Sequence, residues 1–199
     1  EFGLGPAEEP GAPAAWGPAE LRRAGRLQRA LRHLSTEIYS GDAHLLQELL
    51  QNADDNRYPA GAAPSLWVLA SEEALTALNN EVGFSEADLR ALSDVANSSK
   101  AAGALDGEAG RGQIGEKGLG FKSVFRISDT PHIFSGRLRV GFDAQHPWAP
   151  YILPLPLAPG AEEELPISDE QRRRGGWTTA LHLPLRPGLR GSPAAAELV

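Results

Sequence analysis

Two separated groups of residues in this chain have the types and spacing that phosphate chemistry requires. The first runs from Glu48 to Asp55 and places an acid, an amide and a second acid at intervals of four and three residues. Such side chains project from one face of an α-helix, so Glu48, Asn52 and Asp55 are expected to form one polar line. An amide oxygen suits Mg²⁺, and a carboxylate can orient or deprotonate a water. The alternative is a solvated stripe on an amphipathic helix.

The second group is a glycine-rich run that begins sixty residues after Asn52. Four of its nine positions are glycine, and an apolar-periodic segment follows at once. A loop of this kind that opens into a helix can bring backbone N–H groups against phosphate oxygens. The positions that we expect to contact phosphate in and after this run are Gly115, Lys117, Gly118, Leu119, Gly120, Phe121 and Lys122.

The better-known phosphate motifs do not match this run. A P-loop needs lysine directly after its last glycine, whereas Gly120 is followed by Phe121. The dinucleotide fingerprint needs glycine where Ser123 stands. A kinase loop would be followed by HRD and DFG sequences, which this chain does not contain. We therefore expect the glycine run to act together with the upstream helix.

The lysines of the chain are concentrated in the same region. Only three of its 19 basic residues are lysine, namely Lys100, Lys117 and Lys122, and all lie in or beside the glycine-rich loop. Compact ammonium groups at these positions favour a phosphate site. Chance clustering in a polar loop is the alternative.

The elements that must position these residues follow no regular βαβ alternation, which favours an α+β fold. Helices are predicted at 19–39, 43–55, 86–96 (capped by Ser85) and 120–126, and strands at 65–70, 75–79, 131–134, 137–142 and 178–183. Residues 1–18 are expected to be a linker or lead-in, and 97–118 a long loop. The acidic run 162–164 and the basic run 172–174 are expected to lie in a solvated loop.

Composition limits the classes of protein that remain. The chain has 199 residues, 41% of them hydrophobic and 23% charged, which indicates one globular domain. A net charge of −7 argues against a nucleic-acid-binding surface, and no apolar run is long enough to span a membrane. There is no cysteine, and the five histidines show no metal-ligand spacing. We expect an intracellular protein, cytoplasmic or nuclear, of which this chain, lacking methionine, is a fragment.

Three motifs in this order resemble the ATPase domain of the GHKL superfamily, which includes gyrase B, the ninety-kilodalton heat-shock chaperones, histidine kinases and MutL. They are LLQELLQNADDNRYP, NNEVGF and GEKGLGFKSVFRISDTPHIFSG. The similarity is greatest to the branch that contains sacsin and the plant NO VEIN proteins. It covers roughly residues 27–143, with a weaker match at 177–185.

The resemblance implies a two-layer α/β sandwich, called the Bergerat fold, in which helices cover one face of a mixed β-sheet. The ATP-binding domain would span 19–199, with a lid at about 97–117. Glu48 would be the general base and Asn52 the Mg²⁺ ligand. Asp55 would lie on the pocket floor, and Thr179 on a late strand would face adenine.

One phrase departs from the family pattern. Most members have an aspartate in a DxGxG phrase that accepts a hydrogen bond from the adenine amino group. Here the phrase runs from Asn79 through Asn80, Glu81 and Val82 to Gly83. An ungapped match places Asn79 at the aspartate position, whereas matching the acid places Glu81 there. We favour Glu81, because a carboxylate is the better acceptor for that amine.

The function implied is Mg²⁺-dependent ATP binding, with slow ATP hydrolysis driving a chaperone-like conformational switch in a larger protein. Its partners would be ATP and either protein clients or further domains of the same chain, without nucleic acid or membrane. The alternative is a scaffold that binds nucleotide without turnover, or a degenerate interaction domain. The presence of both Glu48 and Asn52 favours hydrolysis.

Overall fold

The computed structural model describes residues 44–93, 121–146 and 153–191, together with Ala19, Arg23, Arg26 and Arg29. Those four positions are helical and fall within the first predicted helix. The predicted lead-in over 1–18 and the predicted loop over 97–118 lie outside the described residues.

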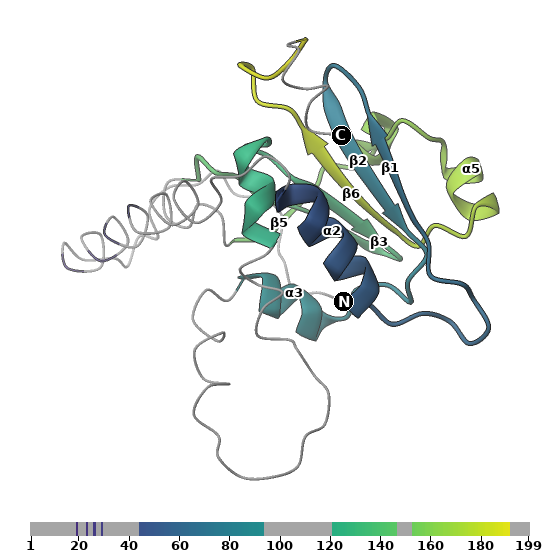
Figure 1. Cartoon of the computed structure of the whole chain (residues 1–199). Helices are drawn as coiled ribbons and strands as arrows, with labels where there is room; N and C mark the ends of the chain where they lie inside the picture. The colour runs from purple at the N-terminus through teal and green to yellow at the C-terminus, as the bar shows by residue number, and fades with distance from the viewer. Residues whose placement is uncertain are drawn as a thin grey trace, which may run out of the picture.

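One antiparallel sheet forms the centre of the described structure (Figure 1). Its strands run in the order β1-β2-β6-β3-β4-β5. Their bounds are Leu66–Ala70 for β1, Ala74–Asn79 for β2, His132–Ser135 for β3, Leu138–Gly141 for β4, Leu155–Pro156 for β5 and Thr179–Pro184 for β6. Each of the five described pairings is antiparallel, so the expectation of a mixed sheet is wrong for these strands. The reason is that β6 enters between β2 and β3 and runs opposite to both.

Three helical segments lie on one face of this sheet. They are α2 (His44–Asp55), α3 (Glu86–Ser93) and the 3₁₀ helix η2 (Lys122–Arg126). Leu45 and Leu49 stand one turn apart on α2, and both are buried in the core cluster that also contains Leu75 and Ala77 of β2. The helix predicted over 43–55 is therefore confirmed, and its apolar side packs on the sheet as the leucine spacing requires.

The start of α3 shows why a short helix forms there. The Ser85 backbone N–H donates to Asp88 Oδ2 at 2.9 Å, and the Asp88 N–H donates to Ser85 Oγ at 3.3 Å. This reciprocal pair satisfies two of the N–H groups that a helix N-terminus leaves without intrahelical partners. The predicted cap is confirmed.

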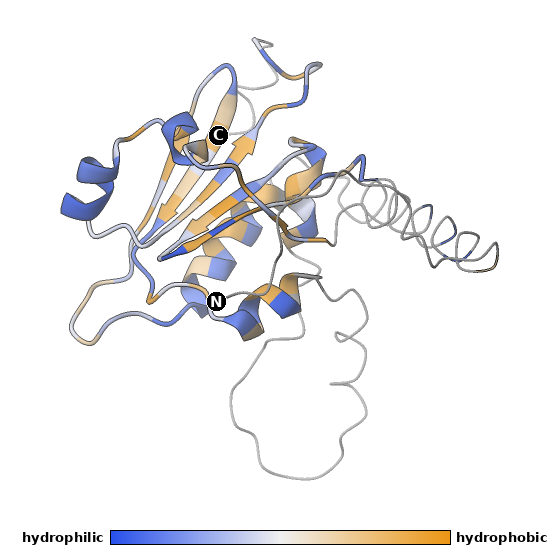
Figure 2. Cartoon of the chain, turned by 180° about the vertical axis from the view of Figure 1, so that it is seen from behind, coloured by the Kyte–Doolittle hydropathy of each residue, from blue (hydrophilic) through white to orange (hydrophobic). Residues whose placement is uncertain are grey.

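The opposite face of the sheet carries a second apolar cluster. Leu78, Phe134 and Ala180 point to this side and pack with Leu165 and Ile167, which belong to the segment after β5. Strand side chains alternate between faces, so β2 contributes Leu75 and Ala77 to one core and Leu78 to the other. In Figure 2 the strands are largely apolar. Both faces of the sheet are thus packed, rather than one alone.

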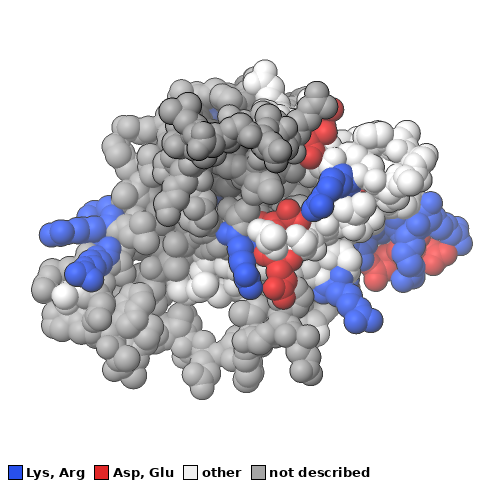
Figure 3. All heavy atoms as spheres, turned by 90° about the horizontal axis from the view of Figure 1, so that it is seen from below, with Lys and Arg blue, Asp and Glu red and all other residues white. Residues whose placement is uncertain are grey.

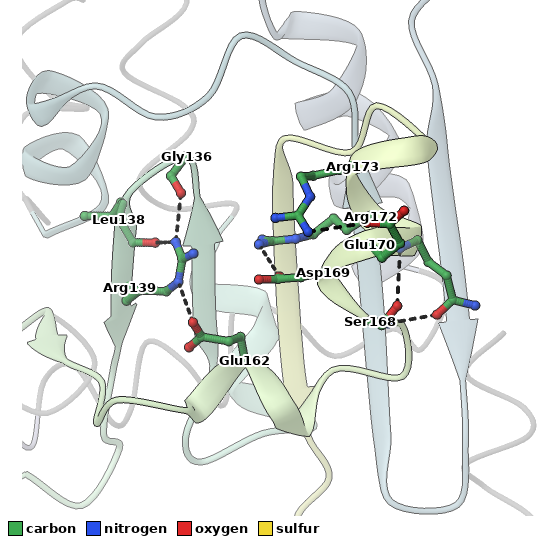
Figure 4. Close-up of polar contacts among 10 residues, drawn as sticks. Gly136, Leu138, Arg139, Glu162, Ser168, Asp169, Glu170, Arg172 and Arg173 are labelled. Atoms are coloured by element: carbon green, nitrogen blue, oxygen red, sulfur yellow. Dashed lines mark hydrogen bonds and ion pairs between the residues drawn. The ribbon is translucent and has the colours of Figure 1, made fainter.

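The two charged runs are helical, which corrects the prediction of a solvated loop. Glu162–Glu164 lie in the 3₁₀ helix η3 (Ala161–Glu164), and Arg172–Arg174 end α5 (Asp169–Arg174). Ser168 and Gln171 form a capping box at the start of α5, where two acids stand in the first turn and three arginines in the last. Both distributions suit the helix dipole. Figure 4 shows these contacts and the Arg139–Glu162 ion pair that joins β4 to η3.

The predicted α+β class is confirmed, since helices and antiparallel strands are both present without βαβ alternation. The helix predicted over 120–126 is a 3₁₀ helix, and β5 was not predicted. None of the helices in the described ranges is long and apolar enough to cross a membrane.

Candidate functional site

A cavity of about 130 Å³ lies between α2, α3 and the sheet. Its floor is apolar and comes from three strands, with Ala77 on β2, Ile133 on β3 and Leu181 on β6. Leu49 of α2 and Leu92 of α3 close it from the helical side. A slot with apolar walls on both sides suits a flat ring.

Seven of the predicted site residues line this cavity, although they come from four separate parts of the chain. They are Asn52, Asp55, Asn79, Glu81, Gly83, Phe121 and Thr179. Phe121 directly follows the glycine run, so the chain reaches the cavity where that run ends. Within the described residues, the fold therefore brings the C-terminal half of the polar line on α2 and the residue that follows the glycine run to one cavity.

The polar line on α2 is only partly at the cavity. Asn52 and Asp55 line it, but Glu48, one turn earlier, does not. Glu48 and Asn52 are both half-buried, whereas Asp55 is exposed. An amide and a carboxylate therefore stand at the cavity, with a second carboxylate set back by one helical turn.

Asn79 and Thr179 form the polar end of the cavity. They are directly paired across β2 and β6, and each is 6% exposed. The Asn79 amide is held at both ends: its Nδ2 donates to the Tyr58 hydroxyl at 2.9 Å, and its Oδ1 accepts from the Glu81 N–H at 2.7 Å. The Tyr58 hydroxyl in turn donates to the Ala53 carbonyl of α2. This chain of bonds joins the C-terminal end of α2 to the end of β2.

A second polar pair lies beside the first. The hydroxyls of Thr179 and Ser135 are 2.7 Å apart, and Ser135 Oγ also accepts from the Phe84 N–H at 2.9 Å. Ser135 stands opposite Thr179 across β3 and β6. The turn from Asn80 to Phe84 is therefore anchored twice, once at Asn79 and once at Ser135.

Gly83 is required by the backbone of this turn. Its φ is +97°, a conformation that residues with a Cβ rarely adopt. A Cβ placed there would lie 3.2 Å from both Ser135 Oγ and Thr178 Cγ2. Glycine therefore lets the turn pack against the polar end of the cavity.

Besides Glu48, two predicted residues lie outside the cavity lining. Asn80 accepts from the Ser65 N–H at 2.8 Å and donates to the Ala63 carbonyl at 2.9 Å, which ties the turn to the segment before β1. Lys122 does not line the cavity. Its Nζ donates to the Leu92 carbonyl at 2.6 Å and lies 5.3–5.9 Å from the centres of three phenylalanine rings, those of Phe121, Phe125 and Phe142.

The surroundings of Lys122 affect its charge. Burial lowers its pKa from 10.5 to about 7, because desolvation penalises the ammonium. The phosphate contact predicted for Lys122 stays a prediction.

The remaining predicted residues of the glycine loop are Lys100, Gly115, Lys117, Gly118, Leu119 and Gly120, which lie outside the described residues.

Sequence reasoning missed several residues that build the site. Tyr58 and Ser135 each contribute one hydroxyl, and Arg57 brings a positive charge to the lining. Both residues lie inside the quoted motifs, but their roles depend on contacts with Asn79 and Thr179, which are distant in the chain. In Figure 3, the described acidic and basic side chains of one face are interspersed.

A second cavity, of about 330 Å³, lies beside the other face of the sheet. There Thr76 Oγ1 and His182 Nδ1 are 2.8 Å apart. Burial, with a further contribution from His132, lowers the pKa of His182 to about 4. His182 is therefore neutral near pH 7. Separately, the described residues include no group of three or more His, Asp or Glu placed to hold a metal ion.

Comparison with known proteins adds the family. The model of the Sacsin domain matches residues 25–152, which is more than half of the chain. The chain belongs to the Sacsin-domain family. It is 42% identical to Protein NO VEIN of Arabidopsis thaliana over 165 residues, which cover 81% of this chain and 6% of that protein. It is 29% identical to human Sacsin over 126 residues, which cover 56% of this chain and 3% of Sacsin. The chain thus spans a small part of the relatives it matches.

Proposed function

We propose that this Sacsin-domain chain binds ATP with Mg²⁺ in the cavity between α2, α3 and the sheet. The observation that carries the proposal is the arrangement of the cavity: Asn79 and Thr179 pair across two strands at its polar end, and Asn52 lies on α2 across an apolar floor. A purine has flat apolar faces and a polar edge, so its ring would occupy the floor and its edge would meet the polar end.

The strand register supports Asn79 over Glu81 as the residue that meets the base. Asn79 is the last residue of β2 and stands opposite Thr179, whereas Glu81 lies beyond the strand, in the turn. Directly opposed residues project to the same face of a sheet. Asn79 and Thr179 would therefore act on the base together.

The residues at the cavity fit Mg²⁺ held mainly by the nucleotide. Magnesium keeps several waters and usually binds through one or two protein oxygens plus substrate phosphates. Asn52 offers one amide oxygen and Asp55 lies one helical turn further along the lining. When bound, Mg²⁺ would neutralise charge that develops on the phosphates.

Hydrolysis is the second part of the proposal. Glu48 stands one turn before Asn52 and would orient or deprotonate the attacking water. The chain would then act as a slow ATPase of the GHKL type, whose nucleotide state sets the conformation of a longer, chaperone-like protein. Its partners would be ATP and either client proteins or neighbouring domains, within the cell.

A scaffold that binds nucleotide without turnover is the second candidate. It is favoured by one observation: Glu48 is not among the residues that line the cavity. A base set back from the cavity would leave binding intact and hydrolysis weak.

Calorimetry and a turnover assay on the same sample test both candidates. ATP is titrated into the chain with Mg²⁺ and again with a chelator, and phosphate release is then followed. Magnesium-dependent binding with phosphate release supports the ATPase. Binding without release supports the scaffold, and no binding in either titration contradicts both.

A further inference from the structure

The amide of Asn79 has a fixed orientation because each of its two hydrogen bonds can form with only one assignment of donor and acceptor. The Glu81 backbone N–H can only donate, so the atom that faces it at 2.7 Å must be the amide oxygen. The Tyr58 hydroxyl donates its single proton to the Ala53 carbonyl, because a carbonyl can only accept. The atom of Asn79 that faces Tyr58 at 2.9 Å must therefore be the amide nitrogen.

These contacts leave the amide with half of its hydrogen-bonding capacity. The oxygen has two lone pairs and the nitrogen two protons, and one of each is used. Asn79 is 6% exposed and lines the cavity, so water does not compete freely for the rest. One acceptor and one donor, at known ends of the amide, remain for a ligand.

Such a pair distinguishes two kinds of purine. Adenine presents an amino donor beside a ring-nitrogen acceptor, whereas hypoxanthine presents a carbonyl acceptor beside an N–H donor. An amide that could rotate by 180° would match either edge. An amide that is locked matches only one, because the other would place donor against donor and acceptor against acceptor.

We propose that Tyr58 is a positioning residue that locks the Asn79 amide and so makes the cavity selective for adenine over a 6-oxopurine. This inference rests on the proposed function, since it concerns the base of the bound nucleotide. Tyr58 is not among the residues that line the cavity; its hydroxyl contacts the Asn79 amide and the Ala53 carbonyl.

The same contacts explain why an amide suits this position. A carboxylate at 79 would still accept from the Glu81 N–H, but it has no proton to give to Tyr58. The Tyr58 hydroxyl would then have to turn from Ala53 to residue 79, and α2 would lose its bond to the end of β2. Asn79 and Tyr58 therefore form a matched pair.

The ratio of the dissociation constants for ATP and inosine triphosphate tests the proposal. Both nucleotides are titrated with Mg²⁺ into the wild-type chain, Tyr58→Phe, Asn79→Leu and the double variant. We expect wild type to prefer ATP, and Tyr58→Phe to lose roughly three- to tenfold of that preference, the effect of one hydrogen bond. Asn79→Leu should bring the ratio near one, and adding Tyr58→Phe to it should change nothing further.

A matched control separates selectivity from stability. Ser168→Ala removes the side-chain hydrogen bond that caps α5, a helix none of whose residues lines the cavity. It should lower stability without moving the ratio. An unchanged ratio in Tyr58→Phe overturns the inference and leaves the proposed function standing, as does equal affinity of wild type for both nucleotides. Wild type that binds neither nucleotide overturns both.

Discussion

The buried ammonium of Lys122 makes the stability of the fold depend on pH in a direction that can be worked out. Burial lowers its pKa from 10.5 to about 7. Between these values the unfolded chain binds a proton that the folded chain has released, so the free energy of unfolding rises with pH. The cost of charging this group is fully present below pH 7 and is absent above pH 10.5.

The size of the effect follows from the same two values. Each pH unit within the window is worth about 1.4 kcal/mol, so from pH 7.5 to 9.0 the wild type should gain about 2 kcal/mol through this residue. Other groups titrate in this range as well. The comparison is therefore with Lys122→Met, which keeps an apolar stem among the three rings and removes the proton.

Urea unfolding at both pH values, followed by tryptophan fluorescence, measures this difference. We expect the wild type to gain about 2 kcal/mol more than Lys122→Met. Equal gains would refute the reasoning, because the Leu92 carbonyl and the three rings would then be keeping the lysine charged at no net cost. The ATP affinity of Lys122→Met distinguishes a phosphate contact from a structural role for this lysine. A phosphate contact requires a large loss of ATP affinity, whereas a structural role predicts little change.

Three further predictions concern the cavity. Thr179→Val removes the hydroxyl 2.7 Å from Ser135 Oγ and should lower the free energy of unfolding by about 1 kcal/mol, measured by urea unfolding. The same variant should bind ATP more weakly, and unchanged ATP affinity would exclude Thr179 from the site. Gly83→Ala places a Cβ where φ is +97° and should lower the free energy of unfolding by about 1–3 kcal/mol. Gly136→Ala, at φ +57° with open space around it, should lower it by less. Equal losses in the two variants would contradict the close packing of the turn at Gly83. Glu48→Ala should keep ATP binding and lose phosphate release, and turnover equal to wild type would remove its catalytic role.

The sequence was most informative where local chemistry decides the structure. The leucines of α2 and the Ser85–Asp88 cap predicted two helices correctly, because both depend on residues within two turns of each other. The capping box of α5 was equally visible in Ser168 and Gln171. It was missed because the charged runs around it were interpreted as solvated loop, although opposite charges at opposite ends also stabilise a helix.

Sequence reasoning was weaker where distant strands decide the outcome. Asn79 and Thr179 are one hundred residues apart, and only the β2–β6 register shows that they face each other. The preference for Glu81 came from its charge and stays a prediction; the structure adds that β2 ends at Asn79 and that both residues line the cavity. The phosphate contact of Lys122 stays a prediction from composition, whereas its contact with the Phe142 ring could not be predicted because residue 142 lies well beyond the glycine run.

The proposed function requires Asn52 and the cavity beneath it to hold Mg²⁺ and ATP. Calorimetric titration of ATP with Mg²⁺ into Asn52→Ala, beside Gln51→Ala, tests it most directly, since Gln51 is the exposed neighbour on the same helix and does not line the cavity. We expect Asn52→Ala to abolish ATP binding, whereas Gln51→Ala should bind ATP as the wild type does. Unchanged ATP affinity in Asn52→Ala would contradict it.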